Sequence, residues 1–246
     1  MDGTVKIALL VSTLLNLLFF GLCSIFVTKR GGITYLIRKL AFLQPFQLRV
    51  AAMYDTPFYQ DKKSHFETLP KSEAEIIFLG DSLTDLCEWS EFFRNNRIKN
   101  RGICGDTTDG ILNRITNIVD SQPQKIFIMI SINDLNQGRD VESIFGNYKQ
   151  TLEVFKNQIP ATEIYIQSVL PVTKRFNEAE INEKIVQLNA KLKDLAKEFS
   201  VQYIDLFSCF LDKNNQLDAR YTLDGVHLNG EGYLLWKQVI EKDVVN

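Results

Sequence analysis

The chain has 246 residues, a formal net charge of −2, and contents of 45% hydrophobic and 24% charged residues. These values are typical of a globular protein, and the length allows one large domain or a domain with appended segments. The near-neutral charge, without a long basic run, excludes nucleic-acid binding as a favoured function. The sequence does not predict the oligomeric state.

The first predicted element is an apolar segment at residues 7–27, interrupted by only a few small or polar residues. At about 1.5 Å per residue, a helix of this length covers the roughly 30 Å core of a bilayer. A cleavable signal peptide has a shorter apolar region and a small-residue exit site, and neither pattern is found here. We therefore predict an uncleaved, single-pass membrane anchor within residues 1–30.

Basic residues flank this predicted anchor unevenly. Lys6 precedes it, whereas Lys29, Arg30, Arg38 and Lys39 follow it. The positive-inside rule therefore favours the cytoplasm for the part of the chain after the anchor. Because N-terminal anchors also commonly export the domain attached to them, the sequence leaves the side of the membrane open.

Residues 31–73 are expected to connect the anchor to the following domain. Residues 33–43 have apolar residues at helical spacing beside a basic pair, which fits a helix in the headgroup layer or an ordinary packing helix. Residues 55–75 are polar and contain two prolines, with room for one helical piece. His65 lies in this polar stretch, so we expect it on the solvated surface.

Residues 74–246 form the predicted domain, in which short apolar runs alternate with longer amphipathic patterns. The predicted strands are 76–79, 98–103, 125–130, 163–169 and 201–206, and the predicted helices are 83–95, 107–120, 141–158, 177–199 and 231–242. Such alternation predicts an α/β fold, in which helices cover both faces of a parallel sheet of about five strands.

A serine stands where the first predicted strand meets the first helix of this domain, in the sequence Gly80-Asp81-Ser82. A turn at this place presents the hydroxyl of Ser82 at the carboxyl edge of the sheet, where ligands of open α/β folds bind. An Asp-Ser helix cap has the same local sequence. The motif alone does not decide between these two interpretations.

The turns after the second and third predicted strands are also polar. Gly105 allows close approach of backbone to a neighbouring group, while Asp106 or Thr107 could cap the next helix. Asn133 and Asp134 follow the third strand, where such residues are usually turn formers. Each of these motifs is weak by itself.

The last polar turn places Asp224 three residues before His227, in a loop that contains a glycine. This pattern fits a hydrogen-bonded surface turn. It also fits an orienting carboxylate beside a general base.

Taken together, the four turns resemble the sequence blocks of the SGNH, or GDSL-type, hydrolase family. The four block residues map onto Ser82, Gly105, Asn133 and His227, and the resemblance covers about residues 74–241. One departure is Ile132, because relatives often carry a small or hydroxyl residue before the Asn-Asp pair. The resemblance implies a three-layer α/β/α fold of flavodoxin-like type and ester hydrolysis without a metal or a cofactor.

The chemistry of these residues agrees with that implication. A serine hydroxyl is a poor nucleophile until a base removes its proton, and His227 is the candidate base for Ser82. Asp224 would accept a hydrogen bond from the other ring nitrogen and fix its tautomer. An oxyanion needs donors, which the backbone N–H groups of Ser82 and Gly105 and the side chain of Asn133 can supply.

Other reactive or aromatic residues have simpler interpretations. The cysteines of the domain, Cys87, Cys104 and Cys209, match no zinc-binding spacing and are expected to be free thiols. Cys104 adjoins the expected oxyanion loop, but a serine already fills the role of nucleophile. Trp89 and Trp236 are expected to pack in the core or at the rim. Two histidines leave no histidine-rich metal site.

These observations predict a membrane-anchored serine esterase that works through an acyl-enzyme. Its substrate would be a lysophospholipid, another short or medium acyl ester, or an O-acetylated sugar, with no cofactor and no nucleic-acid partner. Two alternatives stay open. Acyl transfer to an acceptor other than water uses the same residues, and a non-catalytic, membrane-tethered binding or scaffolding module could share the fold.

Overall fold

In the computed structural model the chain divides into two compact units, residues 1–51 and residues 52–246. The structure describes residues 56–72, 75–173 and 178–245, together with the isolated positions 12, 13, 16 and 19. Within these described residues, no helix combines the length and hydropathy needed to cross a bilayer. Apart from the isolated positions, the predicted anchor and the predicted helix at residues 33–43 lie outside the described residues and stay predictions.

The second unit is built on a parallel sheet in the order β2-β1-β3-β4-β5. Its strands are β1 (Ile76–Gly80), β2 (Ile98–Gly102), β3 (Lys125–Met129), β4 (Glu163–Gln167) and β5 (Gln202–Ile204). All five correspond to predicted strands, with differences only at their ends. The strand order reverses between β1 and β3, and in doubly wound folds ligands bind beside that reversal.

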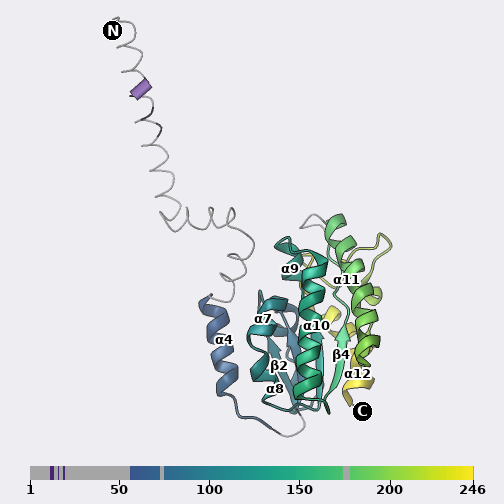
Figure 1. The fold of residues 1–246 in the computed structure, drawn as a ribbon. Coiled ribbons are helices and arrows are strands. Elements are labelled where there is room, and N and C mark those ends of the chain that lie inside the picture. Colours follow the sequence, from purple (N-terminus) through teal and green to yellow (C-terminus); the bar gives the residue numbers. More distant parts are fainter. Residues whose placement is uncertain are drawn as a thin grey trace, which may run out of the picture. The chain divides into compact units, whose positions relative to one another are not determined.

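Side chains alternate along a strand, so β1, β3 and β4 each contribute buried residues to two cores. Ile77 and Leu79 of β1 belong to one core, and Ile76 and Phe78 to the other. Five helices of the described part of the chain cover the first core: α7 (Thr108–Asn113), α8 (Ile115–Val119), α9 (Ile132–Asn136), α10 (Val141–Gln158) and α11 (Glu178–Phe199). Helices α5 (Ser82–Asp85), α6 (Trp89–Phe92) and α12 (Gly230–Val245) cover the second core. Figure 1 shows α10 and α11 in front of the sheet. The predicted three-layer α/β/α fold is confirmed.

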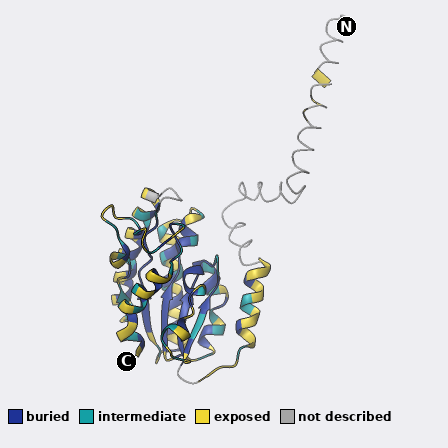
Figure 2. Cartoon of the chain, turned by 180° about the vertical axis from the view of Figure 1, so that it is seen from behind, coloured by how far each residue is buried: buried dark blue, intermediate teal, exposed yellow. Residues whose placement is uncertain are grey.

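The second core contains a cluster of aromatic rings that includes Phe78 of the first strand. The ring of Trp89 lies 4.4 Å from that of Phe78 and 4.9 Å from that of Trp236, measured between centroids. Both tryptophans are fully buried. Figure 2 shows that most of the strand residues between the helices are buried as well, although β5 is only partly buried. Their predicted packing role is therefore confirmed.

The helix predicted at residues 83–95 is instead two short helices, α5 and α6. Asn100 of β2 donates its side-chain amide to the carbonyl oxygens of Thr84, Asp85 and Cys87 at this break. Carbonyl groups at the end of α5 thus have partners without a continuing helix. This capping side chain comes from a neighbouring strand, so helical periodicity did not reveal it.

The polar segment before the sheet contains the helix α4 (Pro57–Thr68), which belongs to the same compact unit. The side chain of Thr56 caps its first turn, and a proline occupies an initial position, where its missing N–H is not needed. Tyr59 and Phe66 are buried against Ile103, which follows β2. His65, in contrast, is exposed as predicted.

Candidate active site

Ser82 is the first residue of α5, directly after β1 and one capping residue. That cap is Asp81, whose carboxylate accepts a hydrogen bond from the N–H of Leu83. Burial raises the pKa of Asp81 to about 7. Glycine is required at position 80 by close packing, because a Cβ there would collide with the carbonyl oxygen of Met129 in β3 and with the side chain of Thr84. The helix-cap interpretation therefore applies to Asp81, which leaves the hydroxyl of Ser82 for other contacts.

The structure brings Ser82, His227 and Asp224 into one chain of hydrogen bonds. Oγ of Ser82 lies 2.9 Å from Nε2 of His227, and Nδ1 of His227 lies 2.7 Å from Oδ2 of Asp224. With Nδ1–H donated to the carboxylate, Nε2 is left to accept the serine proton. The side chain of His227 is 41% exposed, so a substrate from solvent can reach it.

The second oxygen of Asp224 holds the loop that carries the histidine. It accepts hydrogen bonds from the backbone N–H groups of Val226 and His227, at 3.0 and 2.8 Å. Burial by itself would raise the pKa of Asp224, but these bonds and the one from the imidazole lower it to about 2. Asp224 is therefore ionised at neutral pH.

The loop after β2 lies at the same edge of the sheet as Ser82. Gly105 in this loop has a φ of +81°, a left-handed conformation that glycine adopts without strain. No atom lies within 4 Å of where a Cβ would point, so the space above this residue is open. The backbone conformation, rather than crowding, is what requires glycine here.

Asn133 lies in the short helix α9, where the sequence predicted a turn. Its side-chain nitrogen donates to the carbonyl oxygen of Asp106, at 2.9 Å, in the loop that follows Gly105. The two segments expected to supply oxyanion donors are thus joined by a direct hydrogen bond. Ile132, the departure from the family pattern, is buried in the core and so serves packing rather than the loop surface.

A comparison with protein-family models identifies the family of this chain. Residues 78–235 match the model of the GDSL-like lipase/acylhydrolase family. The chain belongs to this family. It is therefore a hydrolase, of the GDSL-like esterase and acylhydrolase kind.

Individual proteins and solved structures are also similar to this GDSL-like chain. The human platelet-activating factor acetylhydrolase IB subunit alpha2 is 27% identical over 168 residues, which cover 65% of this chain and 72% of the relative. A GDSL-like lipase from Bacteroides thetaiotaomicron has a TM-score of 0.68 at 25% identity, covering 76% of this chain and 96% of the other. An acetylxylan esterase from Geobacillus stearothermophilus, with a TM-score of 0.60 at 16% identity, covers 72% and 96% and shares the fold.

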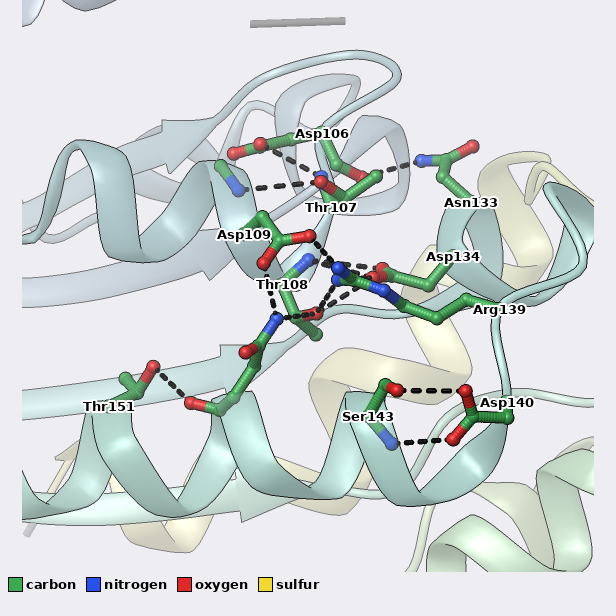
Figure 3. A network of polar contacts seen from close by, with 12 residues as sticks. Asp106, Thr107, Thr108, Asp109, Asn133, Asp134, Arg139, Asp140, Ser143 and Thr151 are labelled. Atoms are coloured by element: carbon green, nitrogen blue, oxygen red, sulfur yellow. Dashed lines mark hydrogen bonds and ion pairs between the residues drawn. The ribbon is translucent and has the colours of Figure 1, made fainter. Parts of the chain in front are cut away.

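In this GDSL-like domain, a buried polar network beside Asn133 joins α7 to α9 (Figure 3). The carboxylate of Asp134 accepts hydrogen bonds from both the N–H and the hydroxyl of Thr108, at 3.0 and 2.7 Å. Arg139 contacts Asp134 and also pairs with Asp109 of α7. From the sequence, Asp134 was expected to form a turn, and only its place beside Asn133 hinted at this role.

A second buried ion pair ties the Gly105 loop to the turn before Ser82. Nε of Arg114 donates to Asp106 at 2.9 Å, and its Nη2 donates to the carbonyl oxygen of Gly80 at 3.2 Å. Arg114 stands at the break between α7 and α8, where one helix was predicted. Removing one partner of such a pair typically costs about 3–5 kcal/mol of stability. No short sequence motif signals this contact.

The structure also bears on Cys104 as an alternative nucleophile. Burial, together with a hydrogen bond to Asp85, raises the pKa of the Cys104 thiol to about 12. Almost no thiolate is then present at neutral pH, so the thiol is a poor nucleophile. Cys87, Cys104 and Cys209 are free, as predicted.

Proposed function

We propose that the protein is a serine esterase in which Ser82, His227 and Asp224 act as a catalytic triad. The observation that carries this proposal is their continuous chain of hydrogen bonds beside the Gly105 and Asn133 loops. Incubation with a fluorophosphonate probe, followed by assays with chromogenic esters, tests it. Probe attachment at Ser82 supports the proposal, and an unlabelled, inactive protein points to a binding module.

In this mechanism Oγ of Ser82 attacks the carbonyl carbon of the ester while its proton passes to Nε2 of His227. The N–H groups of Ser82 and Gly105 and the amide of Asn133 would hold the resulting oxyanion. Collapse of the tetrahedral intermediate breaks the ester bond, and His227 returns its proton to the departing alcohol. Water then attacks the acyl-enzyme by the same steps and releases the acid.

For the substrate we favour a short acyl ester, with acetyl esters first. Support comes from two relatives whose names specify acetyl groups, one an acetylhydrolase and the other an acetylxylan esterase. The longer acyl chain of a lysophospholipid is the competing possibility. A series of chromogenic esters with acyl chains of increasing length separates them, because kcat/KM should be highest for the acetyl ester if our choice is right.

Replacing Asn133 by alanine tests the oxyanion role. We expect kcat to fall by about 10²–10³, the range for loss of one side-chain donor, with probe labelling of Ser82 retained. Steady-state kinetics measures this, and Asn136→Ala, an exposed change in the same helix, is the matched control. An increase in KM alone would show that Asn133 binds the substrate uniformly, contrary to the proposed role.

We also propose that residues 1–30 anchor the enzyme in a membrane. A chain that starts at residue 31 should move from the membrane fraction to the soluble fraction and keep its turnover, because the compact unit with the site begins at residue 52. Fractionation and an assay with a saturating soluble ester check both points. Lost turnover would place the N-terminal segment in the catalytic unit, and unchanged fractionation would show that residues 1–30 are not required for attachment to the membrane.

The side of the membrane needs a separate measurement. The basic residues after the predicted anchor favour a cytoplasmic domain. In sealed inverted vesicles, whose outer surface is the cytoplasmic one, added protease should then degrade the domain. A protected domain would reverse this assignment.

A further inference from the structure

Helix α4 precedes the region that matches the family model, yet it packs against residues on both sides of the loop that contains Gly105. Tyr59 and Phe66 lie two helical turns apart on one face and are buried against Ile103. The hydroxyl of Tyr59 donates to the carbonyl oxygen of Gly110 at 2.8 Å, within α7. These contacts hold α4 beside α7 (Figure 1) and against Ile103, which lies two residues before Gly105.

A polar connection runs from the same face of α4 to that loop. Nζ of Lys62 lies 2.6 Å from Oδ1 of Asp85, and Oδ2 of Asp85 accepts a hydrogen bond of 3.1 Å from the N–H of Cys104. Cys104 directly precedes Gly105, and Asp85 lies three residues after Ser82 in α5. One carboxylate therefore links α4, the nucleophile helix and the expected oxyanion loop.

We propose that Lys62 and Asp85 are positioning residues that hold the backbone N–H of Gly105 in place for the oxyanion. This inference rests on the proposed function, because it assigns the linkage a task in ester hydrolysis. Helix α4 would then contribute to catalysis, although it precedes the residues that match the family model.

Burial and charge explain why this linkage is more than a surface ion pair. The side chain of Asp85 is 11% exposed and that of Lys62 is 30% exposed, so water screens the pair only in part. The ammonium offsets the cost of burying the carboxylate, and the charged acceptor forms a stronger bond to the N–H of Cys104 than a neutral one would. Without Lys62, we expect the carboxylate of Asp85 to turn toward water and to lose its hydrogen bond to the N–H of Cys104.

Lys63 provides a matched control in the same helix. Its Nζ donates to the carbonyl and side-chain oxygens of Asn113 at an exposed position, with no connection to Cys104. In the full chain, Lys62→Met should lower kcat by about 3–10-fold, equivalent to one net hydrogen bond, with KM unchanged. Lys63→Met removes the same charge and should leave both constants unchanged, while Lys62→Arg should restore most of the turnover.

A second measurement follows the loop without using catalysis. Amide hydrogen exchange of residues 103–107 should become faster in Lys62→Met but not in Lys63→Met. Asp85→Ala should show a larger change and a kcat up to about 10²-fold lower, the scale for a misplaced catalytic group. Thermal melting of each variant identifies any general loss of fold. If Lys62→Met or Asp85→Ala proves unfolded, the turnover and amide exchange of Lys62→Arg test the positioning role instead.

The outcomes separate this inference from the proposed function. If Lys62→Met matches Lys63→Met in both kcat and amide exchange, the positioning role is wrong, even though turnover still depends on Ser82. A rise in KM without a change in kcat also overturns it, because substrate binding would then be affected instead. If Ser82→Ala retains full turnover, the proposed function itself fails, whatever the lysine variants do.

Discussion

Ser82→Ala should abolish fluorophosphonate labelling and lower kcat on the order of 10⁶-fold, the loss known for removing the nucleophile of a serine triad. The reason is that no other hydroxyl in the described part of the chain is hydrogen-bonded to His227. The oxyanion donors would leave a small residual rate above that of water. Single-turnover and steady-state assays with a chromogenic acetyl ester measure the change.

The matched control for this experiment is Ser208→Ala. Ser208 is exposed, and its hydroxyl donates to the carboxylate of Asp205 on the surface. This variant should keep both labelling and turnover. Labelling that persists in Ser82→Ala would mean that another residue reacts with the probe, and the triad would have to be reassigned.

The second large effect is expected for Asp224→Asn, with kcat lower by as much as about 10⁴. An amide in place of the carboxylate removes the negative charge beside the imidazole of His227 and allows the wrong tautomer to form. Probe labelling should slow as well, because the attack of Ser82 on the probe needs the same base. Kinetics across a range of pH values measures the loss.

The pH profile adds a check on the role of Asp224. Its folded pKa of about 2 is below the ordinary value of about 3.9, so its stabilising contribution is present above about pH 4 and is lost as the pH falls toward 2. Melting temperatures of the native chain and of Asp224→Asn, measured between about pH 2 and pH 6, check this contribution.

Asp218→Asn is the control for this substitution. Asp218 also has a pKa below the ordinary value, because Arg220 donates hydrogen bonds to it, but it does not contact His227. Its variant should retain turnover within about 2-fold, because the side chain of Arg220 in this pair is 68% exposed and ion pairs of this kind contribute little. If the two variants lose activity equally, the loop as a whole matters rather than the contact between Asp224 and His227.

Much of the architecture was predictable because burial on two faces leaves a local pattern. Strands of a parallel sheet covered on both sides appear as short apolar runs, as in residues 76–79. Strand ends of such a sheet meet at one edge, so Ser82 and Asn133 could be expected at the same edge, whereas the structure shows that their strands β1 and β3 are neighbours. Asp224 and His227, three residues apart, could be paired by their spacing.

Other features depend on partners far away in the sequence, and local patterns do not reveal those. The break after α5 is stabilised by Asn100 from a neighbouring strand, and Asp134 reaches across to Thr108. The contact between Asp85 and the N–H of Cys104 likewise forms only once two segments are adjacent in space. The candidate reacting groups were therefore more predictable from the sequence than the side chains that hold them.

The position of α4 also determines what lies beside one edge of the sheet. Strand β2 lies at one end of the sheet order, and an edge strand can pair with a strand of another molecule. Phe66 of α4 packs against Ile103 and under the guanidinium of Arg101, beside that strand. Proteolytic loss of α4 would uncover this apolar patch next to an open strand edge and leave a fragment prone to aggregation.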